Sequence, residues 1–353
     1  DLAALGIPDA LIKTDYNDFA PRIGLAYNAG KWTFRSGFGI FYAHDVSNAT
    51  QSAMGQNLAG RANVTVNAER PNIPIADPML SARGAGSCSG WTGICQGPAT
   101  RLYTVDTHLR TPYMVQWLFN VQRQLSKSLV LEVGYQGNGG HKLEIFRNYN
   151  EPILRRGTSD SSSLQQRRPW PNLGQIQSVN GVVNSNYHAL TTKLDQRLAR
   201  GLTSMVSFTW SRAIDIGSGL RPSLLTNGSP LNWYDFTSNR GLSDFNVSHR
   251  FVASLIYELP FGKGKGGNAL TSAFNKLAGG WQIGSVVTFA DGTPINVGNI
   301  GDVTNTENSS LPDATGISPF PANQTAQQFW NIGAFNFNNP EDRKSTRLNS
   351  SHT

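Results

Sequence analysis

Apolar and polar side chains alternate along about eight short segments of this chain. The clearest pair of segments is residues 186–213, where Leu190 and Leu194 alternate with Lys193 and Asp195. After a short connection, the second segment of this pair alternates in the same way. Because neighbouring side chains of a β-strand point to opposite faces, the pattern predicts an antiparallel hairpin with one apolar and one polar face.

Three other pairs of segments repeat this pattern. The four predicted hairpins are residues 18–43, 112–137, 186–213 and 247–290. Tight connections at 28–31, 126–128 and 198–201 close the first three hairpins, and a longer one, 260–280, closes the fourth. The long polar segments after the hairpins are 44–111, 138–185, 214–246 and 291–340. Short turns at one end and long loops at the other are typical of an outer-membrane β-barrel.

The predicted fold is therefore all-β: part of an antiparallel transmembrane β-barrel, about eight strands of a larger barrel, with long extracellular loops. Each strand is close to the roughly 9–11 residues that a tilted spanning strand needs. The composition fits, because charged residues are 15% of the chain and mean hydropathy is −0.33. Since no run of 18 apolar residues occurs, the sequence excludes a transmembrane helix.

Aromatic residues recur near the ends of the predicted strands, where the aromatic girdles of a membrane barrel meet the lipid–water interfaces. The girdle candidates are Trp32, Tyr42, Tyr113, Trp117, Tyr135, Tyr187, Trp210, Tyr257 and Trp281. Any one of them could equally be a core aromatic of a β-sandwich. Their recurrence at matching strand positions favours the girdle.

The chain is basic, with a net charge of +7 and an isoelectric point near 9.5. Its basic residues are spread singly over polar strand faces rather than clustered, so we expect no nucleic-acid binding. The charged residues expected to line the lumen are Arg22, Arg35, Lys193, Asp195, Arg197, Arg250 and Glu258. Two interpretations remain open: they contact a plug or guide a solute, or they pair with one another inside a water-filled wall.

The sequence offers little sign of catalytic or metal chemistry. Cys88 and Cys95 are the two cysteines and lie close together in a glycine-rich segment, which favours a disulfide over two free thiols. The histidines lack the spacing of a metal site, and no nucleophile motif occurs. Residues 262–267 suggest a phosphate loop but lack its Gly-Lys-Ser/Thr ending. We expect no enzyme activity, no metal and no cofactor.

Several segments, in order along the chain, resemble the barrel of TonB-dependent outer-membrane receptors, specifically the Oar-like group. They are Asn17–Gly24, Ser185–Leu190, Phe208–Asp215, Arg240–Phe251, Tyr257–Gly264, Gly279–Ile283 and Asp291–Pro294. The resemblance covers most of residues 17–340. It implies energy-coupled passage of an unidentified solute across the outer membrane of a Gram-negative bacterium. It also implies a barrel of about 22 strands around a plug, and an inner-membrane TonB complex as partner.

The sequence departs from that family pattern in several ways. A plug domain, a TonB box, an N-terminal carboxypeptidase-regulatory-like domain and the closing strands are not found in it, and no signal peptide opens it. Residues 342–353 resemble the translation of a sequencing adapter, so we expect native barrel sequence in residues 1–341 alone. Two alternatives stay open: a passive porin-like barrel, and a secreted β-sandwich or adhesin module.

Overall fold

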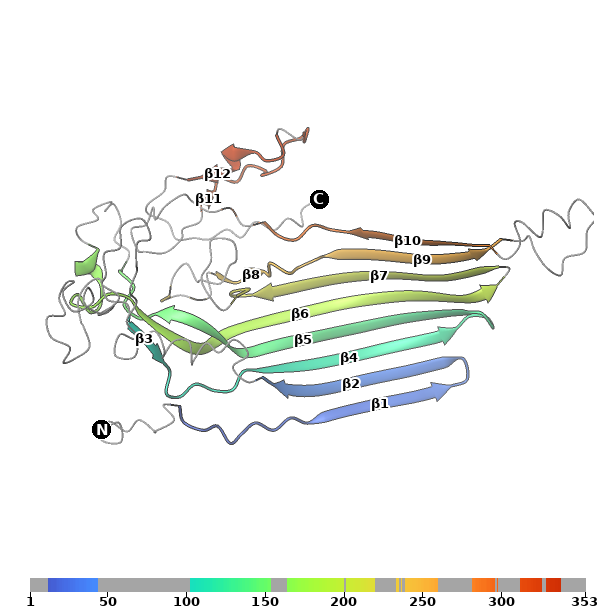
Figure 1. Cartoon of the computed structure of the whole chain (residues 1–353), viewed down its shortest axis with the longest axis horizontal. Coiled ribbons are helices and arrows are strands. Elements are labelled where there is room, and N and C mark those ends of the chain that lie inside the picture. The colour runs from blue at the N-terminus through green and yellow to red at the C-terminus, as the bar shows by residue number, and fades with distance from the viewer. Residues whose placement is uncertain are drawn as a thin grey trace, which may run out of the picture.

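In the computed structural model, eight long strands lie side by side in one sheet (Figure 1). The structure describes residues 12–43, 102–153, 164–199, 201–219, 233–234, 236, 239–259, 281–295, 297, 312–325 and 328–337. The order of the long strands is β1-β2-β4-β5-β6-β7-β9-β10, and each pairs antiparallel with its neighbours. The predicted antiparallel sheet of eight strands is confirmed.

The long strands match the alternating segments of the sequence. They are β1 (Arg22–Ala29), β2 (Trp32–Tyr42), β4 (Tyr113–Gln124), β5 (Leu129–Asn148), β6 (Ile176–Ala199), β7 (Leu202–Asp215), β9 (His249–Glu258) and β10 (Gln282–Ala290). The short elements are β3 (Leu102–Val105), β8 (Gly241–Leu242), β11 (Asp313–Ala314), β12 (Phe335–Asn336) and the 3₁₀ turns η3 (Gln165–Arg167) and η5 (Ile332–Ala334). β3 adds parallel to β6, β8 adds to β7, and β11 and β12 pair with each other.

Tight turns join the strands at one end of the sheet, on the right in Figure 1. Gly30 between β1 and β2 and Gly201 between β6 and β7 have φ angles of +61° and +81°. Residues with a Cβ rarely adopt this left-handed backbone conformation, so glycine suits both turns. At Gly201 a Cβ would also lie 2.9 Å from the backbone oxygen of Glu258.

At the opposite end, β5 and β6 extend far past their neighbours. They contain 20 and 24 residues, about twice the length that spans a membrane. The prediction that residues 138–185 form a loop is therefore wrong over Asn138–Asn148 and Ile176–Ser185. These residues continue β5 and β6. Past the ends of β4 and β7 the two strands form a ribbon, to which β3 adds along β6, and the β5–β6 register shifts between Gly140 and Glu144.

The buried apolar residues gather on this ribbon rather than within the rest of the sheet. On one side, Phe146 and Val179 pack against residues of β3 and the segment after it. On the other side, Ile145 and Val183 pack with Ile216 and Trp233. The long strands themselves leave large apolar side chains exposed, such as Ile23 at 70% and Phe289 at 66%.

Some sequence predictions lie outside the described residues: the Cys88–Cys95 disulfide, the 260–280 connection and the adapter-like segment 342–353. Within the described part of the chain, no helix combines the length and apolar character needed to cross a membrane.

Candidate functional site

The strand register assigns each side chain of the sheet to one of two faces, because residues directly opposite in antiparallel strands share a face. One face is polar. A row across it joins Arg35, Asn120, Gly134, Thr191, Thr209 and Arg250. The next row joins Thr33, Gln122, Glu132, Lys193 and Ser207. The polar positions of separate hairpins thus form one continuous surface.

The charged lumen candidates lie on this polar face. They are Arg22, Arg35, Lys193, Asp195, Arg250 and Glu258. Arg197 follows Asp195 by two positions, where pairing with β7 is interrupted after Gln196. The structure does not bring them into one cluster, since they come from both ends of the strands.

Several of these charges have partners on the same face. The ammonium of Lys193 lies 3.0 Å from the carboxylate of Asp195. The Arg35 guanidinium donates to the Gln122 side-chain oxygen at 3.2 Å, and the Gln282 amide donates to the Glu258 carboxylate at 3.2 Å. These contacts fit the interpretation in which the charged side chains pair with neighbouring side chains on the polar face of the sheet.

The other face is apolar and carries most of the predicted girdle. Its members there are Trp32, Tyr42, Tyr113, Trp117, Tyr135, Trp210 and Tyr257. Trp281 stands two positions before Ile283, the partner of Tyr257. Trp32 and Tyr42 are ten positions apart on β2, or about 34 Å along the strand. At a strand tilt of about 35–45°, this corresponds to about 24–28 Å, close to the height of the apolar band of outer-membrane barrels.

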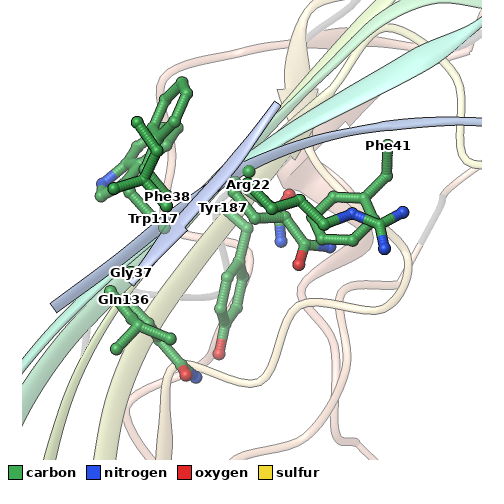
Figure 2. A pocket seen from close by; sticks show the side chains of 13 residues that line it. Arg22, Gly37, Phe38, Phe41, Trp117, Gln136 and Tyr187 are labelled. Carbon is green, nitrogen blue, oxygen red and sulfur yellow. The ribbon is translucent and has the colours of Figure 1, made fainter. Parts of the chain in front are cut away.

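Tyr187 is an exception, and its predicted place in the girdle is wrong. It pairs with Asn138 and Ala213, both on the polar face. Figure 2 shows its ring on the same side of the sheet as Arg22, opposite Phe38 and Trp117. The physical reason is the two-residue period: Leu190 points to the apolar face, so Tyr187, three positions away, points to the other.

Beside Tyr187 the sheet is hollowed, with a cavity of about 350 Å³. Its polar-face lining includes Arg22, Gln116, Asn138 and Tyr187, and glycines of β2 replace larger side chains there (Figure 2). The guanidinium of Arg22 lies 4.6 Å from the centre of the Phe41 ring. The hollow is open, and its lining mixes hydrogen-bonding side chains with the apolar Phe41 and Leu118.

Sequence reasoning missed a packed loop cap, which we define as residues 149–153 and 164–175. Asn150 is fully buried, and its side-chain amide donates to the carbonyl oxygens of Trp170, Leu173 and Gly174 at 2.7–3.0 Å. Its side-chain oxygen accepts from the Trp170 amide at 2.8 Å. No local pattern marks an asparagine for this role, because its partners lie 20–24 positions away.

Within the described part of the chain, no three His, Cys, Asp or Glu side chains come close enough to hold a metal ion. The candidate site is the two-faced sheet itself. One face is apolar with aromatic residues near both ends of the strands, and the other is polar with charges in pairs. This combination defines the class as a membrane β-barrel, whose apolar face contacts lipid and whose polar face lines the interior.

The comparison with protein families agrees. The chain belongs to the outer membrane beta barrel domain family, whose model matches residues 2–351. The protein is therefore located in the outer membrane of a Gram-negative bacterium. In this family setting the long loops face the outside and the tight turns face the periplasm.

Solved structures give more distant similarities. The outer membrane transporter YddB from Escherichia coli is 11% identical, with a TM-score of 0.42, over 77% of this chain and 28% of that chain. The FrpB iron transporter from Neisseria meningitidis is 10% identical, with a TM-score of 0.33, over 68% and 24%. This chain thus spans less than a third of either structure. No curated protein matches the sequence.

Proposed function

We propose that this chain forms part of the wall of a TonB-dependent, Oar-like outer-membrane transporter. In this proposal, a plug domain fills the barrel, and the TonB complex supplies the energy that moves an unidentified solute past it. The polar face lines the route, and no residue of the chain catalyses a reaction or holds a cofactor.

The observation that carries this proposal is the open polar wall. β1 and β10 have no further strand beside them among the described residues, so eight strands do not close the sheet. Barrels of about eight strands fill their interior with side chains, whereas barrels of about 22 strands enclose a lumen that a plug fills. The Oar-like segments quoted above, which follow the order of that family along the chain, add support for the plugged class.

A plugless porin is the second candidate, favoured by the paired charges on the polar face. The Lys193–Asp195 ion pair and the Gln282–Glu258 hydrogen bond are complete without a plug. The third candidate, a secreted β-sandwich or adhesin, is inconsistent with membership of an outer-membrane barrel family.

Two measurements on the complete gene product separate a TonB-dependent transporter from a porin. The first is binding of the purified periplasmic domain of TonB to the protein in detergent. The second is ion conductance of the protein in planar bilayers. We expect TonB binding and little steady conductance, because a plug blocks the lumen. Steady conductance without TonB binding would overturn the proposal and establish a porin.

A further inference from the structure

Basic side chains gather on the apolar face at its loop end, where the girdle meets the outer interface. We name this set the basic patch: His141, Lys142, His188, Arg212 and Arg240. They come from β5, β6, β7 and the residue before β8. The lumen candidates do not include them, since they belong to the lipid side of the wall.

The first part of the basic patch surrounds Tyr113. The ring of His141 stacks on the Tyr113 ring with centroids 5.0 Å apart. The ammonium of Lys142 lies 5.4 Å from the centre of the same ring. Tyr113 pairs with Tyr42 across the sheet, in the loop-end girdle.

A backbone irregularity gives Lys142 this position. The residue has a φ of +53°, which is uncommon for a side chain with a Cβ, and the β5–β6 register shifts between Gly140 and Leu143. Such bulges redirect side chains and are often found at functional sites. Here, consecutive residues His141 and Lys142 both contact Tyr113, although regular alternation would separate them.

Asn186 links the first part of the patch to Arg240. A Cβ placed on Gly139 would lie 3.2 Å from His141 Nε2 and 3.7 Å from Asn186 Nδ2, so these two side chains flank one glycine. The guanidinium of Arg240 donates to the Asn186 side-chain oxygen at 3.3 Å. Arg240 thus reaches the lipid side from outside the long strands.

His188 and Arg212 complete the patch. They lie directly opposite each other on β6 and β7, and both are exposed. The Tyr135 hydroxyl and His188 Nδ1 are 2.7 Å apart, which fixes the His188 ring against the girdle. Three permanent cations, Lys142, Arg212 and Arg240, therefore lie on one rim.

The carboxylate of Asp15, near the patch, already has a cationic partner outside the patch. Arg110 donates to Asp15 at 3.3 Å. Burial raises the pKa of Asp15, but the amide of Asn17, the Arg110 guanidinium and the charge of Lys142 outweigh burial and lower it. Asp15 is therefore ionised and shared with Arg110, which leaves the patch with a positive balance.

Cations on the lipid side of a barrel are tolerated near the interfaces and strongly disfavoured at mid-membrane. At an interface, the charge complement of a cation is the phosphate of a lipid headgroup. We propose that the basic patch is a binding surface for phosphorylated lipid headgroups of the outer leaflet. The aromatic rings beside it contact the upper acyl chains, and the cations and Asn186 bind the phosphate oxygens.

The test uses the complete gene product, purified from outer membranes in dodecyl maltoside. The probe is diphosphoryl lipid A in the same micelles, and affinity is measured by thermophoresis. The variant K142Q/R212Q/R240Q removes the three permanent cations. We expect its affinity to fall by about 100-fold, since each cation near an anionic lipid surface contributes about fivefold.

A matched control removes the same charge at the other end of the strands. Lys31, Arg123 and Lys127 lie at or beside the tight turns, and the variant K31Q/R123Q/K127Q is expected to bind like the wild type. If the first triple variant fails to fold, R240Q alone, which lies outside the long strands, is expected to lose about fivefold.

Two further probes separate a lipid surface from a site for a free anion. Dephosphorylated lipid A is expected to bind at least tenfold more weakly, and inorganic phosphate is expected not to compete at millimolar concentration. Equal binding of the dephosphorylated lipid, competition by free phosphate, or unchanged affinity of K142Q/R212Q/R240Q would each overturn the proposal. None of these readouts depends on a plug or on TonB, so the test stands apart from that of the transport proposal.

Discussion

The indole ring of Trp117 lies over Gly137 of the neighbouring strand. A Cβ on Gly137 would approach within 2.6 Å of two carbons of the indole ring, closer than packed atoms come. Trp117 and Gly137 are cross-strand partners on the apolar face. The glycine thus makes room for a large aromatic side chain, a pairing that also covers the exposed backbone of the glycine.

We therefore expect Gly137→Ala to displace Trp117 and to lower the free energy of unfolding by about 1–3 kcal/mol. Urea unfolding in lipid vesicles, followed by tryptophan fluorescence, measures this change. Gly24→Ala is the matched control, because the nearest atom to its new Cβ would be the Ser36 oxygen at 3.9 Å. Equal stability of the two variants would show that the indole ring moves without penalty.

Individual residues show which parts of the site can be predicted from the sequence and which cannot. The polar-face charges Arg35, Lys193 and Arg250 follow directly from alternation, because each directly neighbours an apolar residue that belongs to the opposite face. The girdle prediction for Tyr187 rests on residue type and conflicts with its alternation with Leu190. The same rule could have identified Arg212, two positions from Trp210, as a cation on the apolar face.

At the scale of elements, the β5–β6 ribbon departs most from the sequence-based prediction. Residues 138–142, Asn-Gly-Gly-His-Lys, show no alternation and look like a loop. Ile145 and Phe146 are consecutive and both buried, since β3 covers one side of the ribbon and Trp233 packs on the other. Alternation predicts strands with one covered face, but here distant segments cover both faces.

The loop cap depends on one buried side chain, Asn150. Asn150→Ala removes four hydrogen bonds and leaves the buried carbonyl oxygen of Gly174 without this donor, a local loss of about 2–4 kcal/mol. We expect trypsin to cleave after Arg167, which is buried in the intact cap, about 30-fold faster or more.

The control for that experiment is Asn28→Ala, in the exposed turn region of β1. Mass spectrometry of the fragments gives the rate of cleavage after Arg167. A rate that is the same in both variants would contradict the role of Asn150.

At the scale of the whole molecule, the sheet ends in two strands whose outer edges are free among the described residues. Every residue of β10 and most of β1 is exposed. Unpaired strand edges invite pairing with further strands. Complete barrels satisfy both edges by closure, and an arc of eight strands does not.

We expect the edges to be detectable by amide hydrogen exchange in detergent. In this chain expressed alone, β1 and β10 should exchange much faster than β5 and β6, and the sample should aggregate. In the complete gene product all eight strands should be protected. Slow exchange of β1 and β10 in a monodisperse sample of the chain alone would mean that the two edges meet and close a small barrel.

The pairing of β3 with β6 has a consequence for the order of folding. Neighbouring long strands such as β1 and β2 meet across a few residues, whereas Leu102 pairs with Ile176, 74 positions later. Closing a longer segment costs more chain entropy, so local hairpins form first. The β3–β6 pair thus forms late, after β6 has joined the sheet, and the side of the ribbon with Phe146 and Val179 stays uncovered until then.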